Sequence, residues 1–453
     1  IASCLVGSEM CIRDSDTTVS NTLNGSVSGT SMANSQPSNT NGVTASITGA
    51  VGGTTVSGTP ANPNPIAAST SGNLIGASAA GNDFANAIQP ASGSPASTPV
   101  DNAASLGVAT NSGTIAAGVA KSKLAVELNN FTNGSAAATD NTISASSVIN
   151  KGSSLVTGGA MAGAKGITGG AALIYPGGTP LFDAQGNIVV TSLQLGTGAA
   201  SGAGLANNRI DLALTSTMAN TVTAGATLER NTLSATLRGN SASSAAEIQA
   251  GAAPSFAGSA VVSNLQANGN GILAAVTHAA DNSNSTVQAL VTGAPAGVVN
   301  ELRGSLSVQG NTISSAATGN EALAASAGSA GNRIVMNGVS VAGAGTTPVN
   351  DTVHGGTAVT STLNADLAVL NSQGNLRSSV LAQTVNGQVL AGVQSIDGGS
   401  VTLKDNSVSA AATGNIASSA ILPGTTAASF AGTAGISNPV SYTHLRAHET
   451  RGN

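Results

Sequence analysis

The phrase LSVQGNTISSAATGN, residues 306–320, decides the fold of this chain because close variants of it recur along the sequence. The variants VTLKDNSVSAAATGN at 401–415 and ATLERNTLSATLRGN at 226–240 repeat its full length. Shorter copies, NLIGASAAGN and NTISASSVIN, begin at Asn73 and Asn141, and the shared asparagines lie 68, 90, 80 and 95 residues apart. Such internal repetition indicates stacked coils, each buried by its neighbours, rather than one globular core.

Each copy of the phrase has the pattern strand, turn, strand. Alternation along an extended strand places Leu306 and Val308 on one face, and Ile313 follows after the turn. We therefore expect these three side chains to face inward, and Ser307 and Thr312 to face solvent.

The turn in each copy contains an asparagine. We expect Asn311 to adopt the left-handed backbone conformation that a tight turn needs, and the same assignment applies to Val401, Leu403 and Asn406 in the later copy. Each interval between copies has room for about two to four coils of roughly 20 to 45 residues. No array of Thr-x-Thr motifs, which would suggest ice binding, is visible in the sequence.

The composition favours a thin core. Of the 453 residues 41% are hydrophobic, but much of this is alanine; aromatic residues make up 2%, Trp is absent, and charged residues make up 7% against an average of about 25%. A globular enzyme core needs large side chains, whereas stacked coils need only small residues with scattered Val, Ile and Leu. Disorder is the alternative, but the net charge of −5 and the mean hydropathy of +0.19 argue against a fully solvated chain.

The two ends differ from the rest of the chain. Residues 5–14 have the sequence LVGSEMCIRD and residues 440–450 have the sequence VSYTHLRAHET, and both resemble translated sequencing adapter. One codon choice for the second segment has a reverse complement that encodes the first, as expected when the same adapter flanks an insert in both orientations. We therefore interpret residues 1–15 and 440–453 as adapter-derived, which leaves the natural start and end of the gene undetermined.

This exclusion removes most of the chemically distinctive side chains, namely Cys4, Cys11, Tyr442, His444 and His448. The remaining chain has no cysteine for a disulfide or a thiolate metal site, which fits an exported protein. Three basic and three acidic residues also fall in the ends, so the net charge of the remainder is again −5. With no basic stripe and almost no aromatic residues we expect no nucleic-acid binding, and no apolar run is long enough to span a membrane.

Prolines concentrate between residues 35 and 100. Because proline cannot donate a hydrogen bond to a sheet, we interpret residues 16–100 as a flexible low-complexity linker or irregular β region. Residues 101–439 then form the β-strand-repeat solenoid. The prolines concerned are Pro37, Pro60, Pro63, Pro65, Pro90, Pro95 and Pro99.

One segment resembles a coenzyme-binding turn. The residues GTGAASGAG at 196–204 follow the strand-like NIVVTSLQL and are similar to the TGxxxGxG turn of short-chain dehydrogenases. That family also has a tyrosine followed four residues later by a lysine, whereas Tyr175 precedes the motif and is followed by Gly178 and Thr179. We interpret the segment as a glycine-rich turn and expect no cofactor.

Other catalytic signals are absent from the sequence. It has no nucleophile elbow, phosphate loop, HExxH motif or EF-hand spacing, and His278 and His354 are isolated. The densest group of charges has no spacing that brings two carboxylates together, so we expect a structural role for it. This group consists of Asp211, Glu229, Arg230, Arg238 and Glu247. We predict no catalytic, cofactor-binding or metal-binding residue, and a protein that is not an enzyme.

The small-residue bias, the Asn, Thr and Ser turns, the missing cysteines and the imperfect repeats of residues 100–439 resemble bacterial β-strand-repeat surface proteins, such as autotransporter passengers and filamentous haemagglutinin-like adhesins. The resemblance implies an all-β parallel solenoid on the cell surface or outside the cell. It implies an adhesive or structural role, with host or neighbouring-cell surface proteins or glycans as partners. Two alternatives stay open: a purely structural spacer or surface-layer component, and a carbohydrate-active β-helix enzyme. The sequence specifies neither the binding partner nor the oligomeric state.

The adapter interpretation makes a direct prediction. Amplifying the locus from source DNA should yield a gene that lacks the codons for LVGSEMCIRD at residues 5–14. Recovery of those codons inside the natural reading frame would refute the interpretation.

Overall fold

The computed structural model is all-β, and the part of the chain that it describes contains no helix. Its strands stack in parallel, layer on layer, into five large sheets, so the predicted fold, a parallel β-solenoid, is confirmed. The described residues are 8–23, 27–58, 66–90, 100–131, 133–159, 171–174, 180–184, 187–216, 222–249, 255–256, 258–269, 271–277, 284–293, 302–323, 331–341, 349–355, 359–375, 379–394, 399–422 and 429–442.

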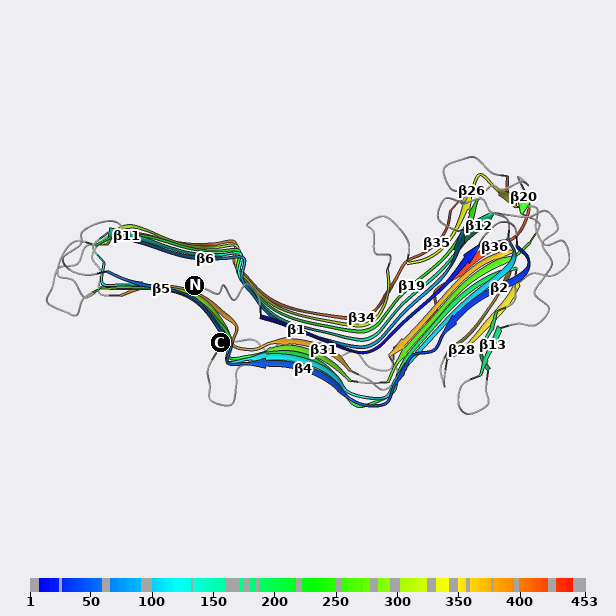
Figure 1. Cartoon of the computed structure of the whole chain (residues 1–453), viewed down its shortest axis with the longest axis horizontal. Coiled ribbons are helices and arrows are strands. Elements are labelled where there is room, and N and C mark those ends of the chain that lie inside the picture. Colours follow the sequence, from blue (N-terminus) through cyan, green and yellow to red (C-terminus); the bar gives the residue numbers. More distant parts are fainter. Residues whose placement is uncertain are drawn as a thin grey trace.

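One coil passes through sheets A, B, C, D and E in that order and then returns to sheet A one layer on. Sheets A and E form one long side of the coil, and sheets B, C and D form the other (Figure 1). Sheet A contains β1 (Ser8–Leu23), β7 (Leu74–Pro90), β12 (Thr142–Gly159), β19 (Thr232–Gln249), β25 (Thr312–Ala322), β26 (Asn332–Asn337), β34 (Ser407–Ala417) and β35 (Ser419–Leu422). Sheet B contains β2 (Val27–Ser35), β3 (Ser38–Asn39), β8 (Val100–Asn111), β15 (Ile188–Gly196), β21 (Ala260–Asn268), β30 (Leu367–Asn375), β36 (Ala434–Ser437) and β37 (Val440–Tyr442).

The other three large sheets contain one strand from each successive coil. Sheet C contains β4 (Val43–Thr48), β9 (Ile115–Ala120), β16 (Ser201–Ala206), β22 (Ile272–Thr277) and β31 (Val380–Thr384). Sheet D contains β5 (Val51–Ser57), β10 (Lys123–Asn129), β17 (Arg209–Thr215), β23 (Thr286–Thr292) and β32 (Gln388–Gln394). Sheet E contains β6 (Ile66–Ser71), β11 (Asn133–Thr139), β18 (Val222–Glu229), β24 (Leu302–Gln309) and β33 (Ser400–Lys404).

Each interval between copies of the repeated phrase is one complete coil. The residues Ile75, Ile143, Leu233, Ile313 and Val408 are paired in register on adjacent strands of sheet A, so the copies lie in adjacent layers. The expectation of two to four coils per interval is therefore wrong. Each coil is a flattened loop stretched along the longest axis of the molecule (Figure 1), and five sheets in series need a longer circumference than a compact coil.

Strands before residue 100 belong to the same sheets as those after it. The first-coil strands β4, β5 and β6 pair in parallel with β9, β10 and β11. Pro37 lies between β2 and β3, and Pro90 is the last residue of β7, so neither interrupts a strand; Pro60, Pro63, Pro65, Pro95 and Pro99 lie outside the described residues. The adapter-like ends also contribute backbone, with Ser8–Asp14 in β1 and Val440–Tyr442 in β37.

Coil length varies at some connections and is constant at one corner. The corner between sheets E and A always separates the same paired columns by seven positions, as from Ala136 to Ile143 and from Leu306 to Ile313. The connection from sheet A to sheet B is the most variable. Its two longest versions contain the antiparallel sheet F, made of β13 (Ala171–Ile174), β14 (Pro180–Ala184), β28 (Val349–Gly355) and β29 (Val359–Ala365). One further version contains β20 (Ser255–Phe256), which pairs with β27 (Ser340–Val341) in the connection that also contains β28 and β29.

The E–A corner turns through a left-handed residue, but this residue is not the asparagine. Gly310, immediately before Asn311, has φ 63°, and Arg230 and Asp140 have φ 52° and 56° at the equivalent positions. The expectation that Asn311 itself is left-handed is therefore wrong. The residue before it makes the turn, which leaves the asparagine side chain free to point into the stack. The corner residues with positive φ are Gly72, Asp140, Arg230, Gly310 and Asp405.

The corner asparagines form a continuous ladder through the stack. Nδ2 of each donates to Oδ1 of the asparagine in the next coil at 2.9–3.0 Å, and its backbone N–H donates to the same oxygen at 3.0–3.2 Å. The second hydrogen on Nδ2 of Asn231 is donated to the Ala138 carbonyl of the preceding coil at 2.9 Å. Each inner amide thus has partners for both its N–H groups and its oxygen. We call this the corner ladder; its members are Asn73, Asn141, Asn231, Asn311 and Asn406.

A second asparagine ladder runs through the bend of sheet A. Nδ2 of each member donates to Oδ1 in the next coil at 2.6–2.8 Å. The same amides reach across the interior to sheet B, as when Asn150 donates to the Leu195 carbonyl at 3.1 Å. These bonds join the two long sides of the coil. The bend ladder contains Asn82, Asn150, Asn240, Asn320 and Asn415, and sheet B adds a glutamine ladder of Gln194, Gln266 and Gln373.

The apolar core is thin and is covered mainly by the neighbouring coils. Leu306, Val308 and Ile313 are 0% exposed, so their predicted inward orientation is confirmed, and Ser307 and Thr312 lie half-buried on the outer side. Val401 and Leu403 occupy the same columns one layer on, yet they are 50% and 56% exposed because β33 is the last described strand of sheet E.

The buried ring of Phe84 fits this core where small residues make room for it. Phe84 is 1% exposed and lies between two glycines of neighbouring strands. A Cβ at Gly107 would lie 2.0 Å from the Phe84 ring, and one at Gly152 would lie 2.1 Å from it. Glycine is therefore required at both positions because the ring takes the volume that a side chain would occupy.

The column of Val308 and Leu403 gives a matched pair of substitutions. Val308→Asp buries an unpaired carboxylate and should lower the free energy of unfolding by about 3 kcal/mol or more, whereas Leu403→Asp should cost less than about 1 kcal/mol because that position is open to solvent. Ser307→Asp, on the outer side, should cost less than about 0.5 kcal/mol. Thermal melts followed by far-UV circular dichroism measure all three. Equal losses for Val308→Asp and Ser307→Asp would contradict the inward register.

The corner ladder gives a second prediction. Asn231→Ala removes the acceptor of two N–H groups of Asn141 and the donor to Asn311 Oδ1, so it should cost at least about 2 kcal/mol. Thr232→Ala, one residue away on the outer side, should change stability by less than about 0.5 kcal/mol. Chemical denaturation monitored by circular dichroism compares them, and similar midpoints would show that the ladder contributes little.

Candidate binding surface

The outer side of the first half of sheet A carries a regular set of hydroxyl groups. Parallel in-register pairing brings Thr142, Thr232, Thr312 and Ser407 into one column across four coils. Two positions along each strand, a second column holds Ser144, Ser234, Ser314 and Ser409. Ser146 and Thr236 begin a third column, which Ala316 and Ala411 continue. We call these three columns the hydroxyl face.

The geometry of the hydroxyl face follows from the sheet. Neighbouring parallel strands lie about 4.8 Å apart, and alternate residues of one strand lie about 6.6 Å apart, so the side chains occupy a two-dimensional grid. The side chains are half-buried in the inner coils, exposed in the last, and short. Ser407 Oγ donates to Thr312 Oγ1 at 3.2 Å, which shows that hydroxyls of adjacent coils are within reach of one another.

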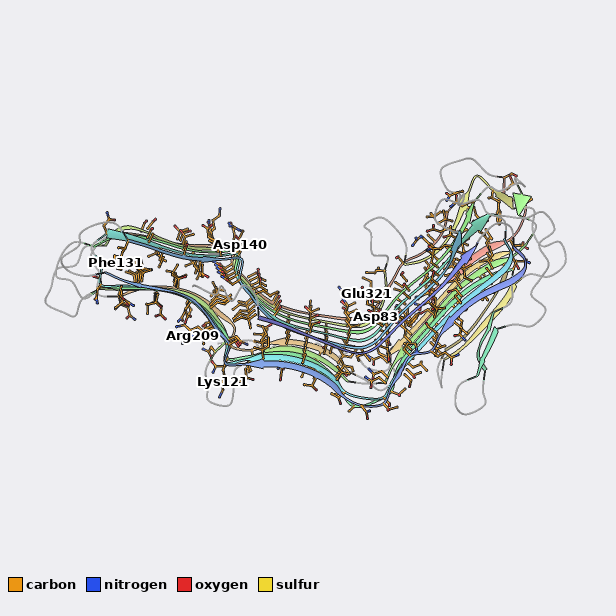
Figure 2. All side chains as sticks on the ribbon, in the orientation of Figure 1. Asp83, Lys121, Phe131, Asp140, Arg209 and Glu321 are labelled. Atoms are coloured by element: carbon orange, nitrogen blue, oxygen red, sulfur yellow. The ribbon has the colours of Figure 1, made fainter. Side chains whose placement is uncertain are left out.

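Charged side chains flank the hydroxyl face and are paired across coils. At the E–A corner, Arg230 donates to both carboxylate oxygens of Asp140, at 2.7 and 3.0 Å, and this guanidinium lowers the pKa of Asp140. At the bend, Lys151 lies 3.5 Å from Asp83 and Arg238 lies 3.4 Å from Glu321. Figure 2 places Asp140 at one end of the flat part of sheet A, and Asp83 and Glu321 at the other. The columns between them are uncharged.

The five charges that are dense in the sequence are dispersed in space. Asp211 lies on sheet D, Glu229 and Arg230 lie at the E–A corner, and Arg238 and Glu247 lie on sheet A on opposite sides of the bend. Arg238 pairs with Glu321 at 3.4 Å, and Glu247 pairs with Arg333 at 2.7 Å. Both Arg238 and Glu247 thus pair with an opposite charge in a neighbouring coil, as structural charges do.

Asp211 is the most deeply buried carboxylate on the outer side of sheet D. Its side chain is 7% exposed, and Oδ2 lies 3.1 Å from Arg209 Nε and 3.8 Å from Lys123 Nζ. Desolvation raises the pKa of Asp211 and outweighs the opposing attraction of the two cations.

The pKa of Glu127, on the neighbouring strand, is shifted in the opposite direction. Its hydrogen bond to Lys123, 2.8 Å long, and the charge of that lysine lower its pKa. Within the described residues no group of three or more His, Cys, Asp or Glu side chains is arranged to hold a metal ion.

The glycine-rich segment 196–204 crosses from sheet B to sheet C. Gly196 ends β15, residues 197–200 turn, and Ser201 begins β16. Residues 197–200 therefore form the expected turn, whereas residues 201–204 lie in β16, and the segment has no helix whose N-terminus could face a pyrophosphate. Tyr175 and His278 lie outside the described residues, and His354 is placed only as backbone of β28.

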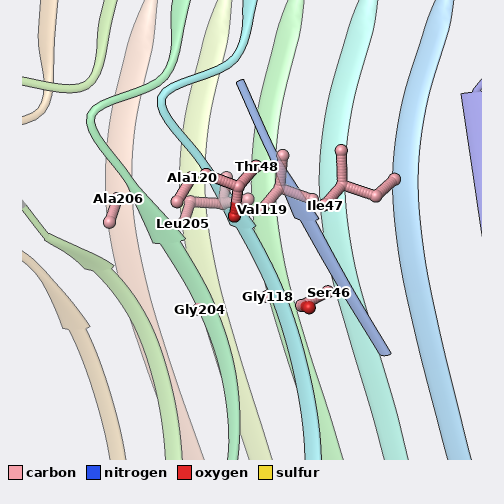
Figure 3. A pocket seen from close by; sticks show the side chains of 9 residues that line it. All are labelled: Ser46, Ile47, Thr48, Gly118, Val119, Ala120, Gly204, Leu205 and Ala206. Carbon is pink, nitrogen blue, oxygen red and sulfur yellow. The ribbon is translucent and has the colours of Figure 1, made fainter. Parts of the chain in front are cut away.

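A shallow groove of 220 Å³ lies over the ends of β4, β9 and β16 (Figure 3). Its lining consists of small and aliphatic side chains with Ser46 and Thr48, and none of the lining residues titrates. Gly118 and Gly204 are paired on adjacent strands, and a Cβ at Gly204 would meet no atom within 4 Å, so the space at these two glycines contributes to the groove. It offers space but no catalytic group.

No family model, curated protein or solved structure matches this chain. The fold itself defines the class of protein, a parallel β-solenoid with wide, flattened coils. The described residues contain no helix, and therefore no helix long and apolar enough to cross a membrane.

Sequence reasoning missed the hydroxyl face. Its signal was present in the repeated phrase, where the second and fourth residues are Thr and Ser in NTISASSVIN, NTLSATLRGN and NTISSAATGN. A search for Thr-x-Thr motifs close together along the chain could not find it. The hydroxyls that share a column come from positions 80 to 95 residues apart, as from Thr232 to Thr312 and from Thr312 to Ser407.

Asp211 and Glu127 make opposite predictions for the pH dependence of stability. The folded pKa of Asp211 is raised, so its contribution is full below the unfolded value of about 3.9 and is lost as pH rises through the folded pKa. Asp211→Asn should therefore gain stability relative to the parent chain between about pH 3 and pH 7. The folded pKa of Glu127 is lowered, so Glu127→Gln should lose stability as pH rises through the same window. Melting temperatures at several pH values test both, and curves parallel to that of the parent would contradict them.

Proposed function

We propose that this chain is part of an extracellular bacterial surface protein and serves as a rigid adhesive or structural scaffold. The observation that carries the proposal is the pair of continuous asparagine ladders, which tie successive coils and the two long sides of each coil together. Such a stack keeps its outer side in a fixed geometry, which suits display of a surface to another cell. Host or neighbouring-cell surface proteins or glycans are the proposed partners.

The outer side supports contact with a partner more than catalysis. Most of the described carboxylates form ion pairs with basic residues of the same coil or of a neighbouring coil. Examples are Asp140 with Arg230 and Glu247 with Arg333. A glycosidase needs two carboxyl groups at a defined separation, one of them free to donate a proton. Asp140 and Glu229 do meet at the E–A corner, but the guanidinium of Arg230 is bound to both of them. The β-helix enzyme alternative therefore has no observation in its favour, and a pure spacer differs from an adhesin only in lacking a partner.

Adhesion can be measured with the full chain coupled to beads. Beads that carry the chain should be retained on cultured epithelial or bacterial cells under flow, and beads that carry albumin should not. Retention should persist when salt is raised, because most of the described charged side chains are paired and screening removes little attraction. Absence of retention for a chain whose circular dichroism shows β-structure would favour the spacer instead.

A further inference from the structure

We propose that the hydroxyl face orders water in a two-dimensional lattice and binds ice. This goes beyond the scaffold role and rests on a separate observation, the register of sheet A. The columns Thr142–Thr232–Thr312–Ser407 and Ser144–Ser234–Ser314–Ser409 repeat one kind of group, an oxygen on a short side chain, in two directions.

The periodicity points to a partner that is itself periodic. Successive coils repeat a hydroxyl about every 4.8 Å along the stack, and alternate residues repeat one about every 6.6 Å along the strand. A protein epitope or a short glycan offers no repeat of this kind, whereas oxygen atoms on the faces of hexagonal ice repeat in two directions at spacings of the same order. Waters held on the grid are thereby placed to join an ice lattice.

The chemistry of the face favours neutral water over the other periodic partners. The two complete columns contain no charge, and the charges that flank them, Arg230 with Asp140 and Arg238 with Glu321, are neutralised in pairs. The face therefore has no pattern of charge that would complement the surface of an ionic crystal. Crystalline polysaccharides are bound through flat aromatic side chains, and none of the outward residues in these columns is aromatic.

The backbone makes the grid rigid, which water ordering requires. The corner ladder lies next to the first column, because Asn141, Asn231 and Asn311 directly precede Thr142, Thr232 and Thr312. The hydrogen bonds between these asparagines, at 3.0 Å, fix the height of each coil on the next. Threonine adds a second restriction because its branched side chain has few rotamers.

The test uses the full chain in slowly growing ice. The fraction of protein taken into the ice is measured beside that of albumin, and recrystallisation inhibition is scored in parallel. We expect the chain to enter the ice and to slow recrystallisation. Ser234→Lys, which places a long charged side chain in the middle of the face, should lose both effects. Ala116→Lys, on the outer side of sheet C, is the matched control and should keep them.

Three outcomes would overturn the inference. The first is exclusion of the parent chain from ice to the same extent as albumin. The second is entry of Ser234→Lys into ice to the same extent as the parent. The third is that Ala116→Lys loses as much ice uptake as Ser234→Lys while circular dichroism shows that both variants are folded. Retention of beads on cells is measured separately, so exclusion from ice with adhesion intact removes this inference and leaves the scaffold function standing. Binding of the parent to glycans without entry into ice also counts against it.

Discussion

The hydrogen bond between asparagine side chains of successive coils is the interaction on which this structure depends. A buried amide that donates to one coil and accepts from another is stable only when both neighbours present the same group at the same height. At the E–A corner this requirement is met by Asn141, Asn231 and Asn311 at 3.0 Å. The recurrence of the repeated phrase follows directly, because any coil without it would leave its neighbours with unpaired polar groups in the interior.

The ladders also explain where the coils are free to vary. The E–A corner keeps seven positions between its paired columns because the asparagine must meet its partner, whereas the A–B connection lies outside both ladders and tolerates insertions as large as sheet F. With register fixed by amides, the apolar core can be thin. Alanine, valine and scattered leucine are sufficient, and a large side chain such as Phe84 is accepted only where Gly107 and Gly152 make space for its ring.

A rigid interior leaves the outer side free to carry a repeated chemical group. Because pleating alternates inward and outward residues, every coil that supplies Ile143, Leu233 or Ile313 to the core supplies Thr142, Thr232 or Thr312 to the surface. The repeat that builds the core therefore also builds the hydroxyl face. Charges are placed at its margins and are neutralised there by partners from adjacent coils, as with Arg230 and Asp140. The surface that results is extended, fixed and uncharged.

The sequence by itself determined the class of fold and the facing of individual residues, such as Val308 inward and Ser307 outward, because pleat geometry acts between residues two positions apart. Only the tertiary structure decided the size of the coil, the left-handed position at Gly310 rather than Asn311, the partners of charges such as Arg238, and the columns of hydroxyls. These depend on which residues meet after a whole coil has closed. Closure of the coil brings together positions as far apart as Asn311 and Asn406. Local patterns along the chain do not predict how many residues one coil contains.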